Sequence, residues 1–168
     1  KAAVLIEALP YIRDFEGKTV VIKYGGAAMT DPELRRSTAE DIVLMKYVGM
    51  NPVIVHGGGP AINETLKRLN IQSSFNAHGL RVTDEQSVQI VEDVLDNVIN
   101  PGIVKMLQGF GGRAVGVHGK DVLVGKKLPL QTEGKTTGID LGFVGEVIDI
   151  RREAIEKAVA AETVPVIS

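Results

Sequence analysis

The stretch PVIVHGGGP (residues 52–60) combines a short apolar run with three consecutive glycines and a proline. The apolar run is rich in β-branched residues, which is typical of a buried strand. Pro60 suits the first turn of a helix. The stretch therefore predicts a strand that passes through a glycine-rich loop directly into a helix.

The same alternation continues along the chain. Further strands are predicted at 19–23, 113–117 and 164–167, and a hairpin-rich edge at 122–130 and 139–150. Helices are predicted at 2–15, 31–49, 60–69, 83–108 and 151–161. Strand–helix alternation with short links predicts an α/β fold, a three-layer αβα sandwich with a largely parallel central sheet and an edge β-hairpin.

Several helix boundaries follow from local signals. Thr30 with Glu33, and Thr83 with Gln86, have the spacing of capping boxes. Pro10 is expected to kink or break the first helix, and the Asn100-Pro101 pair to do the same in the helix over 83–108. We treat 1–16 as a separate N-terminal helix and 17–168 as one domain.

Composition narrows the class of protein. A formal net charge of −2 over 168 residues gives no general attraction to nucleic acid or an anionic membrane. There is no run of about 18 apolar residues, so no membrane span is expected, and no signal peptide is recognised. The absence of cysteine excludes disulfides and suits the cytoplasm. No zinc or calcium ligand spacing is present, so no metal site is predicted.

The first glycine loop follows the strand over 19–23. Lys23 is separated from Gly25 and Gly26 by one residue, which puts an ammonium beside exposed backbone N–H groups. This arrangement suits a phosphoryl group in transfer. It fits a tight turn beside a solvated lysine equally well.

The second loop, Gly57-Gly58-Gly59, lies between a strand and a helix. Glycines let a ligand approach the backbone closely, and a helix N-terminus offers unpaired donors. We therefore expect this loop to bind a ligand, and His56 before it to be a hydrogen-bonded structural residue.

Two common phosphate-binding motifs are excluded. The Walker pattern needs a glycine where Ala114 precedes Lys120, and a Ser or Thr where Asp121 stands. At Gly57 and Gly59 the dinucleotide fingerprint fails because Ile62 occupies its last position. Gly109, Gly111 and Ala114 match its letters, but they follow a predicted helix and precede a predicted strand, which is the reverse of the required context. We expect Lys120 to be structural or gating.

Arg81 is the remaining candidate. It stands beside a predicted helix start, where a guanidinium suits bidentate binding of a carboxylate. A single arginine in such a place is more often a surface residue.

Taken together, the residues resemble the acetylglutamate kinase branch of the amino acid kinase superfamily. The similar segments run in order along the chain: VIKYGG (21–26), VIVHGGGPAIN (53–63), HGLRVTDE (78–85), GGRAVGVHGKD (111–121), DLGFVGEV (140–147) and VPVIS (164–168). The glycine loops fit several branches, whereas GLRVT and DLGFVGEV narrow the resemblance to acetylglutamate kinases.

The resemblance implies transfer of a phosphoryl group from ATP to the side-chain carboxylate of N-acetyl-L-glutamate, a step of arginine biosynthesis. Lys23 would be catalytic and stabilise the transferring group. The implied substrate-binding residues are Gly25 and Gly26 for the phosphoryl group, Gly58 and Gly59 for the attacked carboxylate, and Arg81 for the α-carboxylate.

The resemblance also implies cofactors and partners. The full-length enzyme would use ATP with Mg2+, whereas this chain is expected to end before the family's ATP-binding half, to hold no cofactor tightly and to be inactive alone. A homodimer is expected. The N-terminal helix resembles that of hexameric, arginine-inhibited members, although an ordinary helix packing on its own domain fits nearly as well.

Departures from the family pattern leave alternatives open. Ala27 replaces a polar residue, His118 replaces a Ser or Cys, and Val122 replaces a frequent glycine. One alternative is a related kinase for a carrier-linked aminoadipate or another amino acid. The other is a binding and dimerisation module.

Overall fold

The computed structural model describes residues 2–75, 79–128 and 140–168. The chain divides into two compact units, each assembled from separate stretches of sequence. The first, which we call the sheet unit, comprises Lys1–Gly57, Asn100–Val117 and Glu153–Ser168. The second, the hairpin unit, comprises Gly58–Ile99 and His118–Arg152.

The sheet unit is built on four parallel strands in the order β1-β2-β6-β3. The strands are β1 (Thr19–Tyr24), β2 (Asn51–His56), β3 (Ala114–Val117) and β6 (Val164–Ile167). The helices of this unit are α1 (Ala2–Phe15), α2 (Ala27–Thr30), α3 (Pro32–Tyr47), α6 (Asn100–Gly109) and α8 (Glu153–Ala160). The predicted strands are confirmed to within a residue or two.

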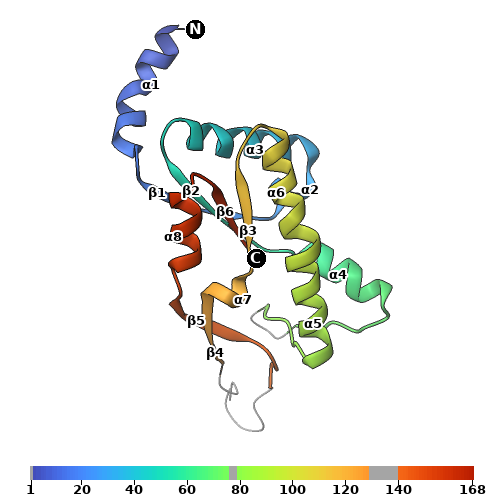
Figure 1. Ribbon diagram of the computed structural model, residues 1–168. Helices are drawn as coiled ribbons and strands as arrows, with labels where there is room; N and C mark the ends of the chain where they lie inside the picture. The colour runs from blue at the N-terminus through green and yellow to red at the C-terminus, as the bar shows by residue number, and fades with distance from the viewer. Residues whose placement is uncertain (1, 76–78, 129–139) are drawn as a thin grey trace. The chain divides into compact units, whose positions relative to one another are not determined.

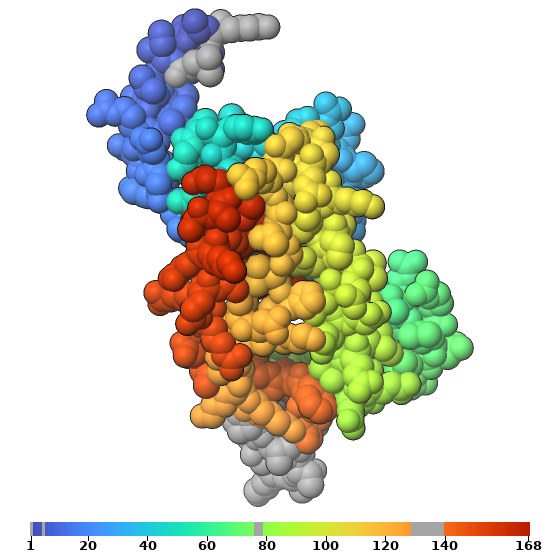
Figure 2. Space-filling model, in the orientation of Figure 1, coloured from blue at the N-terminus to red at the C-terminus, as the bar shows by residue number. Residues whose placement is uncertain are grey.

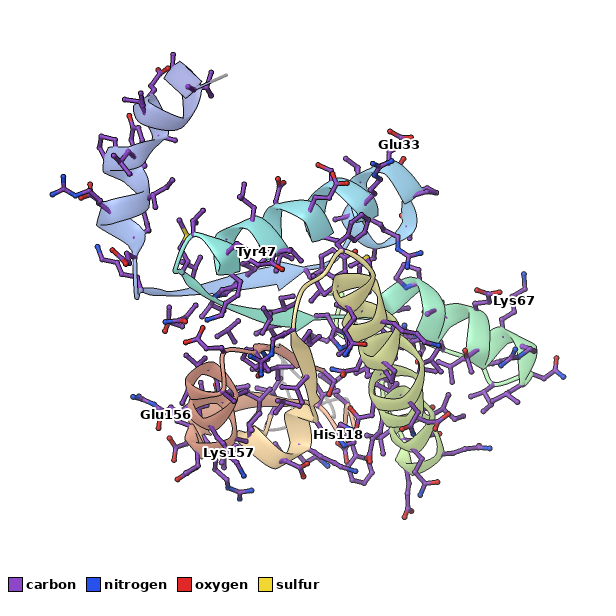
Figure 3. All side chains as sticks on the ribbon, turned by 45° about the horizontal axis from the view of Figure 1, so that its top comes forward. Glu33, Tyr47, Lys67, His118, Glu156 and Lys157 are labelled. Atoms are coloured by element: carbon purple, nitrogen blue, oxygen red, sulfur yellow. The ribbon has the colours of Figure 1, made fainter. Side chains whose placement is uncertain are left out.

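The order of the strands explains the layers. The chain moves from β1 to β2 and on to β3 in one direction across the sheet, and then returns from β3 to β6. Because parallel crossovers are right-handed, α3 and α6 should cover one face and α8 the other. Figures 1 and 3 show this arrangement, with the sheet between α8 and the pair α3 and α6. The α/β architecture with a parallel central sheet is confirmed.

The core of the sheet unit is centred on β6. All four residues of this strand are buried, as expected for a central strand covered on both faces. From one face α3 contributes Ile42 and Val43, and α6 contributes Ile103 and Leu107, all of them buried. Each such side chain gains about 1.5–3 kcal/mol on burial, so the sheet and its flanking helices stabilise one another.

The hairpin unit contains α4 (Gly59–Arg68), α5 (Glu85–Asp93), the π-helix η1 (Val94–Ile99), α7 (Gly119–Val122), β4 (Leu123–Lys127) and β5 (Gly145–Ile150). β4 and β5 pair antiparallel and form a two-stranded sheet of their own. Ile62 and Leu66 of α4 form a buried cluster with Val94. The predicted strand ends at 129–130 and 139, and His78 of the HGLRVTDE segment, lie outside the described residues.

Two helices begin one residue later than the predicted capping boxes imply. Asp31 caps α3 and Asp84 caps α5, so Thr30 and Thr83 are not the N-caps. The Leu34 N–H donates to Asp31 Oδ1 at 2.9 Å. In α5 the Ser87 N–H donates to Asp84 Oδ1 at 2.7 Å, and hydrogen bonds from the Ser87 side chain and backbone lower the pKa of Asp84. Aspartate is at least as good an N-cap as threonine, which explains the shift.

Of the expected kinks or breaks at the internal prolines, neither takes the form of a break. Pro10 lies within α1. Pro101 lies in the first turn of α6, and the π-helix η1 comes directly before that turn. Proline lacks an N–H, and its ring clashes with the carbonyl four residues earlier. A π-helical turn is wider than an α-helical one and would relieve this clash, which accounts for the helix continuing through Pro101. No helix in the described part of the chain is long and apolar enough to cross a membrane.

Candidate functional site

The first glycine loop and the start of the second lie side by side at the carboxyl edge of the parallel sheet. Tyr24, the last residue of β1, pairs with His56, the last residue of β2. The Gly57 N–H then donates to the Tyr24 carbonyl oxygen at 3.3 Å. Ligands of open α/β sheets bind beyond this edge. The sheet unit therefore brings the first glycine loop and Gly57, the first residue of the second loop, to the edge where such a fold binds its ligand.

Lys23 and Tyr24 point to opposite faces of β1, as neighbours in a strand must. The Lys23 side chain is exposed, whereas Tyr24 is buried and donates its hydroxyl to the Ala28 carbonyl oxygen at 2.6 Å. Burial raises the pKa of Tyr24. Tyr24 thus anchors the loop that follows β1, and Lys23 keeps its ammonium in solvent at the strand end.

The glycines of the two loops are required for different reasons. Gly26 has a φ of 59°, a backbone conformation that residues other than glycine rarely adopt. A Cβ on Gly25, Gly57 or Gly59 would meet no described atom of its own unit within 4 Å. Neither a positive φ nor packing within these units explains those three glycines. The open space in front of them suits a ligand that approaches the backbone.

Gly58 has a structural reason to be glycine. A Cβ at this position would lie 2.4 Å from Ile99 Cδ1 and 2.8 Å from Leu95 Cδ2, both in η1. Gly58 is also the N-cap of α4 and offers no side chain to the first helical turn, which contains no acidic residue. The N–H groups and the partial positive charge of this helix end remain available to an anion.

Arg81 is fixed in the hairpin unit by uncharged partners. Its NH1 donates to Ser73 Oγ and its NH2 to Asn63 Oδ1, and its guanidinium lies 4.6 Å from the centre of the Phe75 ring. No carboxylate of the described residues forms an ion pair with it. Partial burial lowers the pKa of Arg81, but a guanidinium keeps its charge in proteins. The positive charge is therefore oriented and not neutralised, as an anion-binding residue requires.

Asn63 connects Arg81 to the second glycine loop. It lies on α4, whose first residue is Gly59 and whose N-cap is Gly58. Three of the predicted site residues, Gly58, Gly59 and Arg81, thus belong to one connected part of the hairpin unit. The other three, Lys23, Gly25 and Gly26, belong to the sheet unit.

The segment after β3 supports a structural role for Lys120. Its ammonium pairs with Glu92 of α5, which raises the pKa of Lys120. Nearby, His118 Nδ1 lies 3.6 Å from Asp96 Oδ2. Over the ranges 2–75, 79–128 and 140–168, no three His, Cys, Asp or Glu side chains are grouped as metal ligands.

The sequence did not indicate the polar residues that support the site. Asn63 and Ser73 hold Arg81, and buried Asn100 contacts buried His56. Their one visible signal is a polar residue where an apolar one would fit, as at Asn100 within an otherwise apolar turn. The structural interpretation of His56 agrees with its burial and its hydrogen bonds.

The chain belongs to the amino acid kinase family, whose model matches residues 18–168. Over its whole length it is 52% identical to the acetylglutamate kinase of Thermoanaerobacter pseudethanolicus, of which it covers 54%. It is 50% identical to that of Geobacter sulfurreducens, of which it covers 59%. The chain thus spans about half the length of these relatives.

A solved structure gives the same fold. It is an N-acetylglutamate synthase from Neisseria gonorrhoeae, complexed with coenzyme A and N-acetyl-glutamate. It matches 99% of this chain with a TM-score of 0.77 at 22% identity, and the match covers 37% of the synthase. At this identity the likeness supports the fold alone.

The different reasons for the glycines give a testable contrast. Gly58→Ala should lower the free energy of unfolding by about 1–3 kcal/mol, because the new methyl group overpacks against Leu95 and Ile99. Gly59→Ala should not lower it, because the site is open and alanine is the better helix former. Urea unfolding of the two variants beside the unchanged chain measures this. Equal losses would contradict the assignment.

Proposed function

We propose that this chain forms the substrate-binding part of an enzyme that phosphorylates the side-chain carboxylate of N-acetyl-L-glutamate with ATP. The observation that carries the proposal is the hydrogen bond between the starts of the two glycine loops, at the edge where this fold binds ligands. The 52% identity to an acetylglutamate kinase supports the substrate and does not favour a carrier-linked aminoadipate.

In the proposed reaction, a carboxylate oxygen attacks the γ-phosphorus of ATP, the bond to the β,γ-bridging oxygen breaks, and an acyl phosphate and ADP result. Lys23 and the backbone N–H groups of Gly25 and Gly26 stabilise the charge on the transferring group. The N–H groups of Gly58 and Gly59 hold the attacking carboxylate. These groups act by position and electrostatics, which is the usual contribution of the protein to phosphoryl transfer.

Arg81 is proposed to hold the α-carboxylate of the substrate. The support is its oriented, un-neutralised guanidinium and its connection through Asn63 to the helix that begins at Gly59. With the α-carboxylate held by Arg81 and the side-chain carboxylate held by Gly58 and Gly59, only the side-chain carboxylate would be in position to attack the phosphoryl group.

The amino acid kinase family implies ATP, usually with Mg2+, as the phosphoryl donor. When bound, Mg-ATP supplies the transferable group and neutralises part of its charge. We propose that the binding residues for the nucleotide lie in the half of the enzyme that this chain does not span, and that the isolated chain does not turn over.

Lys23→Ala, made in the complete enzyme that carries this chain, tests the proposed catalytic role. We expect kcat to fall about 100- to 1,000-fold, as for loss of one pre-set electrostatic donor, with a much smaller change in the KM for N-acetylglutamate. Lys67→Ala, which removes an exposed lysine from the last turn of α4, is the matched control and should leave both constants unchanged. A Lys23→Ala enzyme with normal kcat would refute the role.

Calorimetry of the chain with N-acetyl-L-glutamate tests the role of Arg81. Arg81→Ala should weaken binding about 10- to 100-fold, because a charged hydrogen-bonding partner is lost. Arg68→Ala, in the last turn of α4, is the control. As a second ligand we use the analogue of N-acetyl-L-glutamate in which an amide replaces the α-carboxylate. Arg81→Ala should hardly change the binding of this analogue. An equal loss for both ligands would assign Arg81 to another part of the substrate or to the fold.

We also propose that α1 joins copies of the chain. Five of its large apolar side chains, Val4, Ile6, Leu9, Tyr11 and Phe15, are exposed, and Val4, Ile6 and Tyr11 are each about two-thirds accessible. Figure 2 shows α1 side chains (blue) at the surface. Such a surface is unfavourable in water unless another surface covers it. The expected assemblies are a homodimer through the rest of the chain and a hexamer through α1, with arginine as an inhibitor of the hexamer.

Light scattering at several protein concentrations checks this second proposal. Ile6→Asp with Tyr11→Asp should reduce the particle mass to that of a smaller assembly, because two charges would have to be buried in the contact. An Asp14→Asn control should not change the mass. An unchanged mass in the double variant would contradict assembly through α1.

A further inference from the structure

Two polar side chains are buried together under the start of the second glycine loop. His56, at the end of β2, is 5% exposed, and Asn100, at the start of α6, is 2% exposed. Asn100 Nδ2 donates to the Val166 carbonyl oxygen at 2.8 Å and lies 3.2 Å from His56 Nε2. His56 Nδ1 lies 3.1 Å from the Gly57 carbonyl oxygen. All four residues belong to the sheet unit.

These contacts assign the protons of the imidazole. A carbonyl oxygen only accepts, so the contact with Gly57 requires a hydrogen on Nδ1 of His56. An amide nitrogen only donates, so the contact with Asn100 requires Nε2 to be the acceptor. The pair therefore selects the neutral tautomer of His56 that carries its hydrogen on Nδ1.

This tautomer fixes the orientation of the peptide group that joins Gly57 to Gly58. The group is planar and trans, so the Gly57 carbonyl and the Gly58 N–H point in opposite directions. A hydrogen bond that fixes the carbonyl oxygen also fixes the direction of the Gly58 N–H. On its other side Gly57 is held by its own N–H, which donates to Tyr24. A glycine would otherwise be free to rotate.

The neighbouring strand accommodates this arrangement. A Cβ on Gly116 of β3 would lie 2.3 Å from Asn100 Oδ1, so only glycine leaves room for the amide. The asparagine thus occupies a space bounded by β2, β6 and β3 at the carboxyl ends of the strands. Hydrogen bonds to several partners fix the orientation of a buried amide, whereas an apolar side chain of the same size would impose no such orientation on its neighbours.

We propose that Asn100 and His56 are positioning residues that aim the Gly58 N–H at the substrate carboxylate. This inference rests on the proposed function, because it takes the Gly58 N–H to be a substrate donor. Neither side chain touches the substrate. Asn100 sets the tautomer, His56 holds the Gly57 carbonyl, and the peptide group directs the donor.

Two substitutions of His56 separate positioning from simple core stability, when made in the complete enzyme. In His56→Asn the amide nitrogen takes the place of Nδ1 and still donates to Gly57. In His56→Gln the longer side chain places its amide oxygen where Nε2 was, so it still accepts from Asn100. It has no donor near the Gly57 carbonyl oxygen, so that contact is lost. We expect His56→Asn to keep kcat within about threefold and His56→Gln to lower it at least about tenfold, a part of the effect of losing a whole donor.

The unfolding temperatures of both variants are measured alongside. If the pair acts by positioning, His56→Asn, which keeps a donor to the Gly57 carbonyl, should have the higher kcat even if His56→Gln has the higher unfolding temperature. If kcat falls equally in both variants, or follows their stabilities, the pair is structural and the proposal is wrong.

A second readout does not depend on activity. The 15N shifts of the His56 ring in the unchanged enzyme should show the Nδ1–H tautomer, and the amide shift of Gly58 should move in His56→Gln but not in His56→Asn. Asn100→Leu should weaken the tautomer preference and move the same amide. An Nε2–H tautomer, or a Gly58 amide indifferent to all three changes, would overturn the proposal. Failure of the unchanged enzyme to phosphorylate N-acetylglutamate would instead refute the proposed function, and the shifts would still decide the positioning.

Discussion

A single hydrogen bond, from the Gly57 N–H to the Tyr24 carbonyl, joins the strand before the first glycine loop to the start of the second, and the proposed site depends on both loops. It continues the parallel pairing of β1 with β2 by one step beyond the last paired residues, Tyr24 and His56. Because parallel strands end at the same edge, this pairing brings the starts of both glycine loops to the same level. If β1 shifted by one residue against β2, Lys23 would exchange faces with Tyr24 and the loops would no longer start together.

Within each unit, the residues of the proposed site combine buried or paired support with open space in front of some of the glycines. Packing explains Gly58, and a positive φ explains Gly26, whereas Gly25, Gly57 and Gly59 face space that the rest of their unit leaves free. Behind the loops the supporting groups are buried or paired, including Tyr24, His56 and Asn100. Such a division is expected of electrostatic catalysis, in which donors must already be oriented when the charge develops.

The charge of Arg81 follows the same principle. Neutral oxygens and a ring face orient the guanidinium without cancelling its charge. Lys120 is the opposite case, since Glu92 pairs with it directly. This difference in partners, which the letters of the sequence do not contain, separates a candidate ligand-binding cation from a structural one.

Much of the architecture could be predicted because it depends on local pattern. β-Branched runs located the four central strands, and their alternation with helices gave the layers. The N-caps at Asp31 and Asp84 and the π-helix before Pro101 were missed, because neighbouring residues compete for a cap and a π-turn has no distinct sequence pattern. The supports Asn63, Ser73 and Asn100 were missed because their partners lie far away in the chain, and only the fold brings them together.

The most direct test is a crystal structure of the complete enzyme with N-acetyl-L-glutamate and a non-hydrolysable ATP analogue. We expect the side-chain carboxylate within about 2.7–3.2 Å of the Gly58 and Gly59 amide nitrogens, the Lys23 ammonium beside the γ-phosphate, and Arg81 on the α-carboxylate. A substrate bound away from both glycine loops, with Lys23 far from the γ-phosphate, would contradict it.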